Sequence, residues 1–218
     1  HCEERELDRL EAKLQIERDI KSDYSWHAEA NMWAQKQRLH GFTTAELAQI
    51  YNKPKKAMDE IFAMREIAAE YLRSRGKENV WSEVQDKYAF QELVKARAAT
   101  QSPSDRELIK EASFALIDDP DNTGDRLYAV IPKVREHLAA VKQGLAEAFP
   151  LPPSQIDKTA EAAFGGGEKT PLEDGGVRSS DMALIAAIKK DESSIRQARK
   201  VVVDIIRAQD EQNREKDT

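Results

Sequence analysis

The chain has 218 residues, of which 40% are hydrophobic, 34% charged and 6% aromatic, with one cysteine and a formal net charge of −6. This composition predicts a soluble, cytoplasmic, all-α protein, because helix-favouring residues fill its periodic segments. It excludes an internal disulfide, a thiolate metal cluster and a membrane-spanning helix, and it argues against a protein that coats nucleic acid over its whole surface.

The first two predicted elements are helices. A helix over 3–20 is indicated by leucines at helical spacing, which would form one buried stripe. A second helix over 26–39 begins after Ser25, a suitable N-cap, and ends before Gly41. We expect its two tryptophans to lie in the core. The leucines are Leu7, Leu10 and Leu14, and the tryptophans are Trp26 and Trp33.

The stretch GFTTAELAQIYNKPKKAMDEIF, residues 41–62, predicts a helix-turn-helix, in which a short first helix braces a longer second one. Thr43 or Thr44 caps the first helix, and the second covers 55–73. Asn52 occupies the sharp turn, because asparagine tolerates positive φ better than most residues. The expected inward positions are Leu47, Ala48, Tyr51, Met58, Ile61 and Phe62.

Lysines crowd the start of the second helix, where backbone N–H groups and the helix dipole add to their attraction for phosphate. Residues 53–77 carry seven basic and four acidic side chains. We therefore predict that this helix enters the major groove of DNA from residue 55 to about residue 65. The candidate base-reading residues are Lys56, Asp59 and Glu60. The candidate backbone contacts are Thr43, Thr44, Lys53, Lys55, Arg65, Arg73, Arg75 and Lys77.

A second interpretation is that this helix pair serves packing alone. Lysines at a helix start are commonly solvated, and Asp59 and Glu60 would repel a phosphate backbone. The chain would then be an α-helical interaction adaptor with no DNA role, whose last helix recruits a partner. The acidic net charge and the long polar segment after residue 149 favour this alternative.

Further helices are predicted beyond Gly76. Residues 79–99 read as one helix or as a broken pair of helices. Ser104 and Glu107 have the spacing of a capping box, which predicts a helix that starts at this point.

The next predicted element is a turn at 118–125, followed by a helical segment over 126–149. Pro132 must lie in the first turn of that segment or kink it. Residues 150–181 are rich in Pro and Gly and predict a flexible linker. A long C-terminal helix is expected over 182–218.

An apolar stripe along this last helix needs a cover, so the helix either packs back on the main body or pairs with another copy. The stripe consists of Met182, Ile185, Ile188, Ile195, Val202, Ile205 and Ile206. The expected domains are a helix-turn-helix DNA-binding region (1–100), a helical extension (101–149), a flexible linker (150–181) and a C-terminal helix that could serve for dimerisation (182–218).

Three short motifs follow one another in residues 17–72: a degenerate ENxxR-type box, a helix opening, and a G[LF]T introduction to the helix-turn-helix. In this order they resemble the central region of ParB-like partition proteins. The motifs comprise Glu17, Arg18 and Lys21, then Glu29 and Ala30, then Gly41, Phe42 and Thr43.

The resemblance implies a homodimer that binds a centromere-like or operator site in double-stranded DNA, associated with the bacterial nucleoid and with a ParA-type ATPase as partner. The role would be segregation of a plasmid, phage or chromosome, or regulation. It also implies a clamp that depends on CTP and is formed by an upstream domain outside this chain, with Glu17, Arg18 and Lys21 at the nucleotide-contact positions here.

We expect no catalytic residues, no bound cofactor and no metal site within the chain itself, which is therefore not expected to be an enzyme. The histidines lack the spacing of metal ligands. The GGGEKT stretch at 165–170 lacks the spacing of a phosphate-binding loop. The histidines are His1, His27, His40 and His137.

Overall fold

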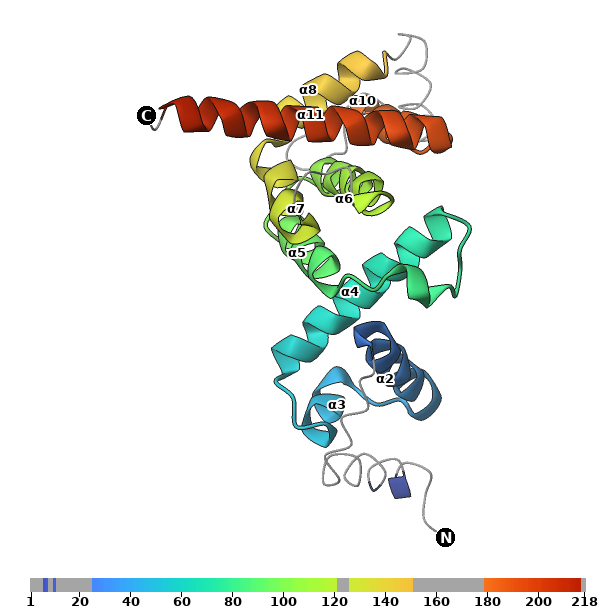
Figure 1. Cartoon of the computed structure of the whole chain (residues 1–218). Coiled ribbons are helices and arrows are strands. Elements are labelled where there is room, and N and C mark those ends of the chain that lie inside the picture. The colour runs from blue at the N-terminus through green and yellow to red at the C-terminus, as the bar shows by residue number, and fades with distance from the viewer. Residues whose placement is uncertain (1–5, 8–9, 11–24, 121–125, 151–178, 217–218) are drawn as a thin grey trace, which may run out of the picture. The chain divides into compact units, whose positions relative to one another are not determined.

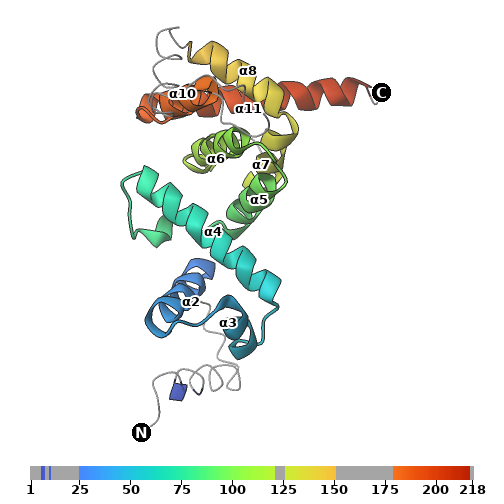
Figure 2. The ribbon, with the colours of Figure 1, turned by 180° about the vertical axis from the view of Figure 1, so that it is seen from behind.

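The computed structural model describes residues 6–7, 10, 25–120, 126–150 and 179–216. Within these residues the regular elements are all helices, with no strand, which confirms the predicted all-α fold. The chain divides into two compact units, unit 1 (1–94) and unit 2 (95–218), and helix α5 (Lys87–Ala98) contains the boundary. Figures 1 and 2 show the helices from opposite sides.

Unit 1 is built around a long helix, α4 (Lys55–Ser74), which packs against α2 (Trp26–His40) and α3 (Thr44–Ile50). These bounds agree with the predicted helices to within one residue. Gly41 ends α2 with φ of 65°, a left-handed conformation that favours glycine, and its N–H donates to the Gln37 carbonyl at 2.9 Å.

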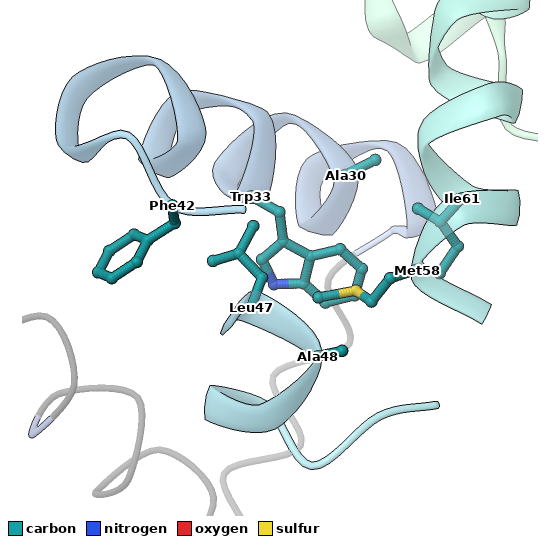
Figure 3. Packing of buried hydrophobic residues seen from close by; sticks show 7 residues of the cluster. All are labelled: Ala30, Trp33, Phe42, Leu47, Ala48, Met58 and Ile61. Atoms are coloured by element: carbon teal, nitrogen blue, oxygen red, sulfur yellow. The ribbon is translucent and has the colours of Figure 1, made fainter. Parts of the chain in front are cut away.

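A buried apolar cluster joins these three helices (Figure 3). Trp33 of α2 is fully buried in it, between Leu47 of α3 and Met58 of α4. Burial of a side chain of this size contributes about 2 to 3 kcal/mol, so the cluster fixes the helix pair. Its members are Ala30, Trp33, Phe42, Leu47, Ala48, Met58 and Ile61, with Tyr51 and Phe62 packed against it. The six predicted inward positions and Trp33 are all among them, whereas Ala30 and Phe42 were not predicted to be buried.

The second half of α4 packs in another apolar group of unit 1. The ring of Phe90 lies 5.8 Å from the Trp26 ring and 6.1 Å from the Tyr71 ring. The indole N–H of Trp26 donates to the Val84 carbonyl at 3.0 Å. Of the two possibilities for 79–99, the chain adopts the broken pair, a 3₁₀ helix η1 (Trp81–Glu83) followed by α5.

Unit 2 is a bundle in which α6 packs against α7, α10 and α11, while α11 also covers α8 and α7. In Figures 1 and 2 the long α11 lies beside α8 and α10. The helices are α6 (Pro103–Ile117), α7 (Leu127–Glu136), α8 (Leu138–Ala148), α10 (Ser179–Ile188) and α11 (Glu192–Lys216).

One prediction about a helix end in unit 2 is wrong. Helix α6 is capped by Ser102, whose hydroxyl accepts from the Asp105 N–H at 3.4 Å, because Pro103 takes the first helical position and leaves Ser104 inside the helix. The segment over 126–149 is helical, as predicted, and is divided at His137 into α7 and α8. Pro132 lies inside α7, beyond the first turn that was one of its two predicted places.

The C-terminal region is two helices instead of the predicted single long one. Asp191 separates them, because its carboxylate accepts from the Ser194 N–H at 2.8 Å and so caps α11. The apolar face of α11 packs back on α6, α7 and α8, while Met182 of the predicted stripe is 41% exposed. The buried residues of α11 are Ala198, Val202, Val203 and Ile206.

Two other sequence predictions fall largely on residues outside the described ranges. Most of the linker predicted over 150–181 and most of the first helix lie there. Within the described part of that helix, Leu7 is 54% exposed and Leu10 is 52% exposed. The predicted buried stripe is therefore wrong at these two leucines.

Charged side chains also meet at the junction of α6, α8 and α10. The ammonium of Lys142 lies 2.6 Å from Asp105 and 2.9 Å from Asp181. Burial alone would lower the pKa of Lys142, but the hydrogen bonds and negative charges of the two aspartates outweigh it and raise the pKa. The three side chains tie α10 to α6 and α8.

Candidate nucleic-acid interface

The structure places a helix-turn-helix at α3 and α4, joined by the four residues 51–54. Thr43 is the N-cap of α3: its hydroxyl accepts from the Glu46 N–H at 3.2 Å, and the Glu46 carboxylate accepts from the Thr43 N–H at 2.8 Å. This reciprocal pair is a capping box, which fixes the entry of the chain into α3.

The turn has the backbone that the sequence predicts. Asn52 has φ of 49°, in the left-handed region that asparagine tolerates. The N–H of Lys53 donates to the Ala48 carbonyl at 2.9 Å and closes the turn. Pro54 precedes the first helical residue of α4, where its fixed φ suits the change into a helix. The start of α4 is therefore set by local chemistry.

The outer face of the first turns of α4 is open among the described residues. Lys55 and Lys56 are exposed, and so is Asp59 one turn further on. Lys56 makes no ion pair with any residue that the structure describes. The ammonium of Lys55 lies 2.7 Å from the Asp59 carboxylate, with 62% and 47% of the two side chains exposed. These three side chains are therefore accessible to solvent as far as the described residues are concerned.

Lys53, the third lysine of the predicted cluster, is engaged inside the fold. Its ammonium lies 2.6 Å from the Glu29 carboxylate of α2 and 4.7 Å from the centre of the Trp33 ring. An ion pair and a cation–π contact thus act on the same ammonium. Lys53 is therefore engaged with α2, whereas Lys55 and Lys56 are exposed.

Two candidate residues lie on flanks of α4 that pack against the rest of unit 1. Glu60 accepts from the Gln91 side chain at 2.9 Å. Arg65 donates to the Asn31 side chain at 2.7 Å and lies 5.7 Å from the Trp81 ring centre. Both side chains are half-buried, so the structure does not bring them together with Lys56 and Asp59.

The remaining basic candidates gather at the other end of α4. Arg73 is exposed, Arg75 lies 5.5 Å from the Tyr71 ring centre, and Lys77 lies 3.3 Å from Glu83. At the helical rise of about 1.5 Å per residue, Arg73 is about 25 Å from Lys56 along the axis. The predicted contact set is therefore split into two groups, one at each end of α4.

The two candidate threonines lie at the start of α3. Besides capping α3, Thr43 is exposed, and Thr44 accepts from the Gln37 side chain at 3.2 Å. Arg38, in the last turn of α2, is also exposed and makes no ion pair with a described residue. Arg38 is not among the predicted contacts, whose basic members all lie after the turn. A cation just before Gly41 was the available signal.

Other kinds of site find no support in the described part of the chain. Its histidine, cysteine and carboxylate side chains form no group of three that could hold a metal ion. None of its helices is long and apolar enough to cross a bilayer. The positions compared with a nucleotide box, Glu17, Arg18 and Lys21, lie outside the described residues.

Comparison with known proteins adds no family assignment. No protein-family model, no curated protein and no solved structure matches the chain.

Proposed function

We propose that this chain binds double-stranded DNA, with the first turns of α4 in the major groove. The observation that carries the proposal is the open outer face at the start of α4, held by a helix-turn-helix with a buried core. In this proposal Lys56 and Asp59 read base edges, and Lys55 contacts phosphate. Thr43 at the start of α3 and Arg38 at the end of α2 supply further backbone contacts.

The electrostatics of the helix start support this proposal. The first turn of α4 begins with Lys55 and Lys56 and contains no acidic residue. Cations near the positive end of a helix dipole are unfavourable by about 0.3 to 1 kcal/mol in the free protein. A bound phosphate reverses the sign of this interaction, because the dipole and both ammonium groups then attract the same anion.

The biological role that we propose rests on the resemblance of residues 17–72 to ParB-like partition proteins. In this role the protein binds a centromere-like or operator site as a homodimer, with a ParA-type ATPase as partner. The covered apolar face of α11 leaves the last helix without a free stripe for pairing. We therefore place self-association elsewhere than on that face.

The proposal can be tested by selecting binding sites from a random duplex library and measuring affinity by fluorescence anisotropy over a range of salt. We expect the double variant Lys55→Glu and Lys56→Glu to abolish binding. The matched control is Lys190→Glu with Lys200→Glu, which makes the same change of charge at exposed positions of unit 2. No binding at low salt, or equal loss in both double variants, would contradict the proposal.

The second candidate is an interaction adaptor with no DNA role. The observation in its favour is that two of the three lysines at the turn already have carboxylate partners, Glu29 and Asp59. The covered face of α11 counts against the version in which that face recruits the partner. The charge-reversal experiment separates the two candidates, because an adaptor would show no salt-dependent affinity for a duplex.

A further inference from the structure

Lys53 is tied to both helices that precede α4. Its backbone N–H donates to the Ala48 carbonyl of α3 at 2.9 Å. Its ammonium reaches α2, where it lies 2.6 Å from Glu29 and 4.7 Å from the ring centre of Trp33. Because Trp33 is fully buried in the core of the helix pair, this contact joins the turn to a fixed part of the fold.

The three lysines at the turn differ in what they would lose by binding phosphate. Lys56 has no described ion-pair partner, so its ammonium is available. Lys55 has a partner one turn further along its own helix, in an exposed pair that salt and water weaken. Lys53 is only 35% exposed and would have to leave both Glu29 and the indole ring.

We propose that Lys53 is a positioning residue of the DNA-binding unit and does not itself contact phosphate. This inference rests on the proposed function. Lys53 lies two residues before the first residue of α4, so its link to Glu29 and Trp33 fixes where the helix begins and in which direction it leaves the turn. A small change of that direction moves Lys56 and Asp59 away from the base edges, which lowers discrimination between sequences more than it lowers general affinity.

Salt titration separates the two roles, because each phosphate contact contributes about 0.9 to the slope of log affinity against log salt concentration. The variants Lys53→Met and Lys55→Met are compared on a selected duplex and on a mixed-sequence duplex of equal length. We expect Lys55→Met, which removes a phosphate contact, to reduce the slope by about 0.9 on both duplexes. We expect Lys53→Met to leave the slope unchanged. It should reduce the ratio of the affinity for the selected duplex to that for the mixed-sequence duplex by about tenfold, which corresponds to a lost base contact of about 1.4 kcal/mol.

Two further variants keep the test decisive if Lys53→Met unfolds. Lys53→Arg preserves the charge and the ability to pair with Glu29 and stack on Trp33, so it should retain the wild-type affinity ratio. Glu29→Gln removes the partner charge and should lower the ratio in the manner expected for Lys53→Met, again with an unchanged slope.

Three results would overturn the inference while leaving DNA binding intact. These are a slope reduced by about 0.9 in Lys53→Met, a wild-type affinity ratio in that variant, or a steeper slope in Glu29→Gln, which would mean that the released lysine binds phosphate. Absence of binding by the wild-type chain would instead overturn the proposed function, and this inference with it.

Discussion

The ammonium of Lys55 lies 2.7 Å from the carboxylate of Asp59, one helical turn further along the outer face of α4. A lysine placed N-terminal to its acidic partner is the weaker order for such a pair, since both charges then oppose the helix dipole. Both side chains are largely exposed, and the pair contributes about 0.5 kcal/mol or less to folding. We expect the pair to affect DNA binding at this face more than it affects folding.

Replacing Asp59 by Asn should strengthen binding to a mixed-sequence duplex several-fold, because it removes a negative charge beside the phosphates and releases Lys55. The free energy of unfolding should change by less than about 0.5 kcal/mol. Anisotropy and urea unfolding measure the two quantities. Glu66→Gln, an exposed carboxylate further along α4, is the matched control and should strengthen binding less. Equal effects would place Asp59 outside the contact face.

Replacing Asn52 by Ala should lower the free energy of unfolding by about 1 kcal/mol, because alanine is strained at the φ of 49° that the turn requires. Asn52→Gly should be close to neutral, since glycine adopts this conformation without strain. Chemical denaturation of both variants measures the difference. If Ala and Gly had the same effect, the left-handed conformation would not be what selects asparagine here.

Gly144 lets α8 and α11 approach closely. A Cβ built on it would collide with the end of the Ile205 side chain and lie 3.2 Å from a methyl carbon of Val201. Gly144→Leu should therefore destabilise the protein by about 2 kcal/mol. Gly144→Ala combined with Ile205→Val, which removes the colliding methyl, should be more stable than the sum of the two single changes predicts. Strict additivity in thermal unfolding would contradict the contact.

Replacing Lys142 by Met should lower the free energy of unfolding by about 2 kcal/mol, because it leaves Asp105 and Asp181 without their shared partner. The folded protein raises the pKa of Lys142, so this stabilisation is fully present below the ordinary pKa of 10.5. It is lost as the pH rises through the raised value. Denaturation of wild type and variant at neutral and strongly alkaline pH should show their difference shrinking only at high pH.

Acid should weaken the fold through His27. Its imidazole stacks on the Trp81 ring, with 6.3 Å between ring centres, and burial lowers its pKa below the ordinary value of 6.5. The unfolded chain therefore binds the proton more readily, and the free energy of unfolding falls as the pH drops through 6.5 towards the folded value. Urea unfolding should show a smaller loss between about pH 7.5 and pH 5.5 in His27→Gln. An identical loss would exclude His27 as the source.

The sequence predicted the helix-turn-helix well because its boundaries are set locally. Gly41, Asn52 and Pro54 each impose a backbone geometry that neighbouring residues cannot override. The cap of α6 was misplaced for a related reason: two serines fit the capping spacing, and only the preference of Pro103 for the first helical position decides between them. The break at Asp191 was missed because the apolar stripe continues across it.

The candidate site was harder to predict. The order of residues shows that Lys53, Lys55 and Lys56 are close together, but not that a glutamate 24 positions earlier neutralises one of them. Likewise, Glu60 and Arg65 lie within the part of α4 that was predicted to enter the groove. They are on other sides of the helix, however, where they contact Gln91 and Asn31. Such pairings depend on how helices cross, which no single stretch of sequence encodes.

Helix α4 belongs to two cores at once, since Met58 packs with Trp33 near its beginning while Tyr71 packs with Phe90 near its end. Because α4 is an uninterrupted helix of 20 residues, a displacement of one end moves the other end as well. A ligand that pushes on the lysine-bearing end therefore strains the aromatic group at the other end. Binding of a ligand at the N-terminal end of α4 should therefore be detectable near its C-terminal end, as slower amide hydrogen exchange around Phe90.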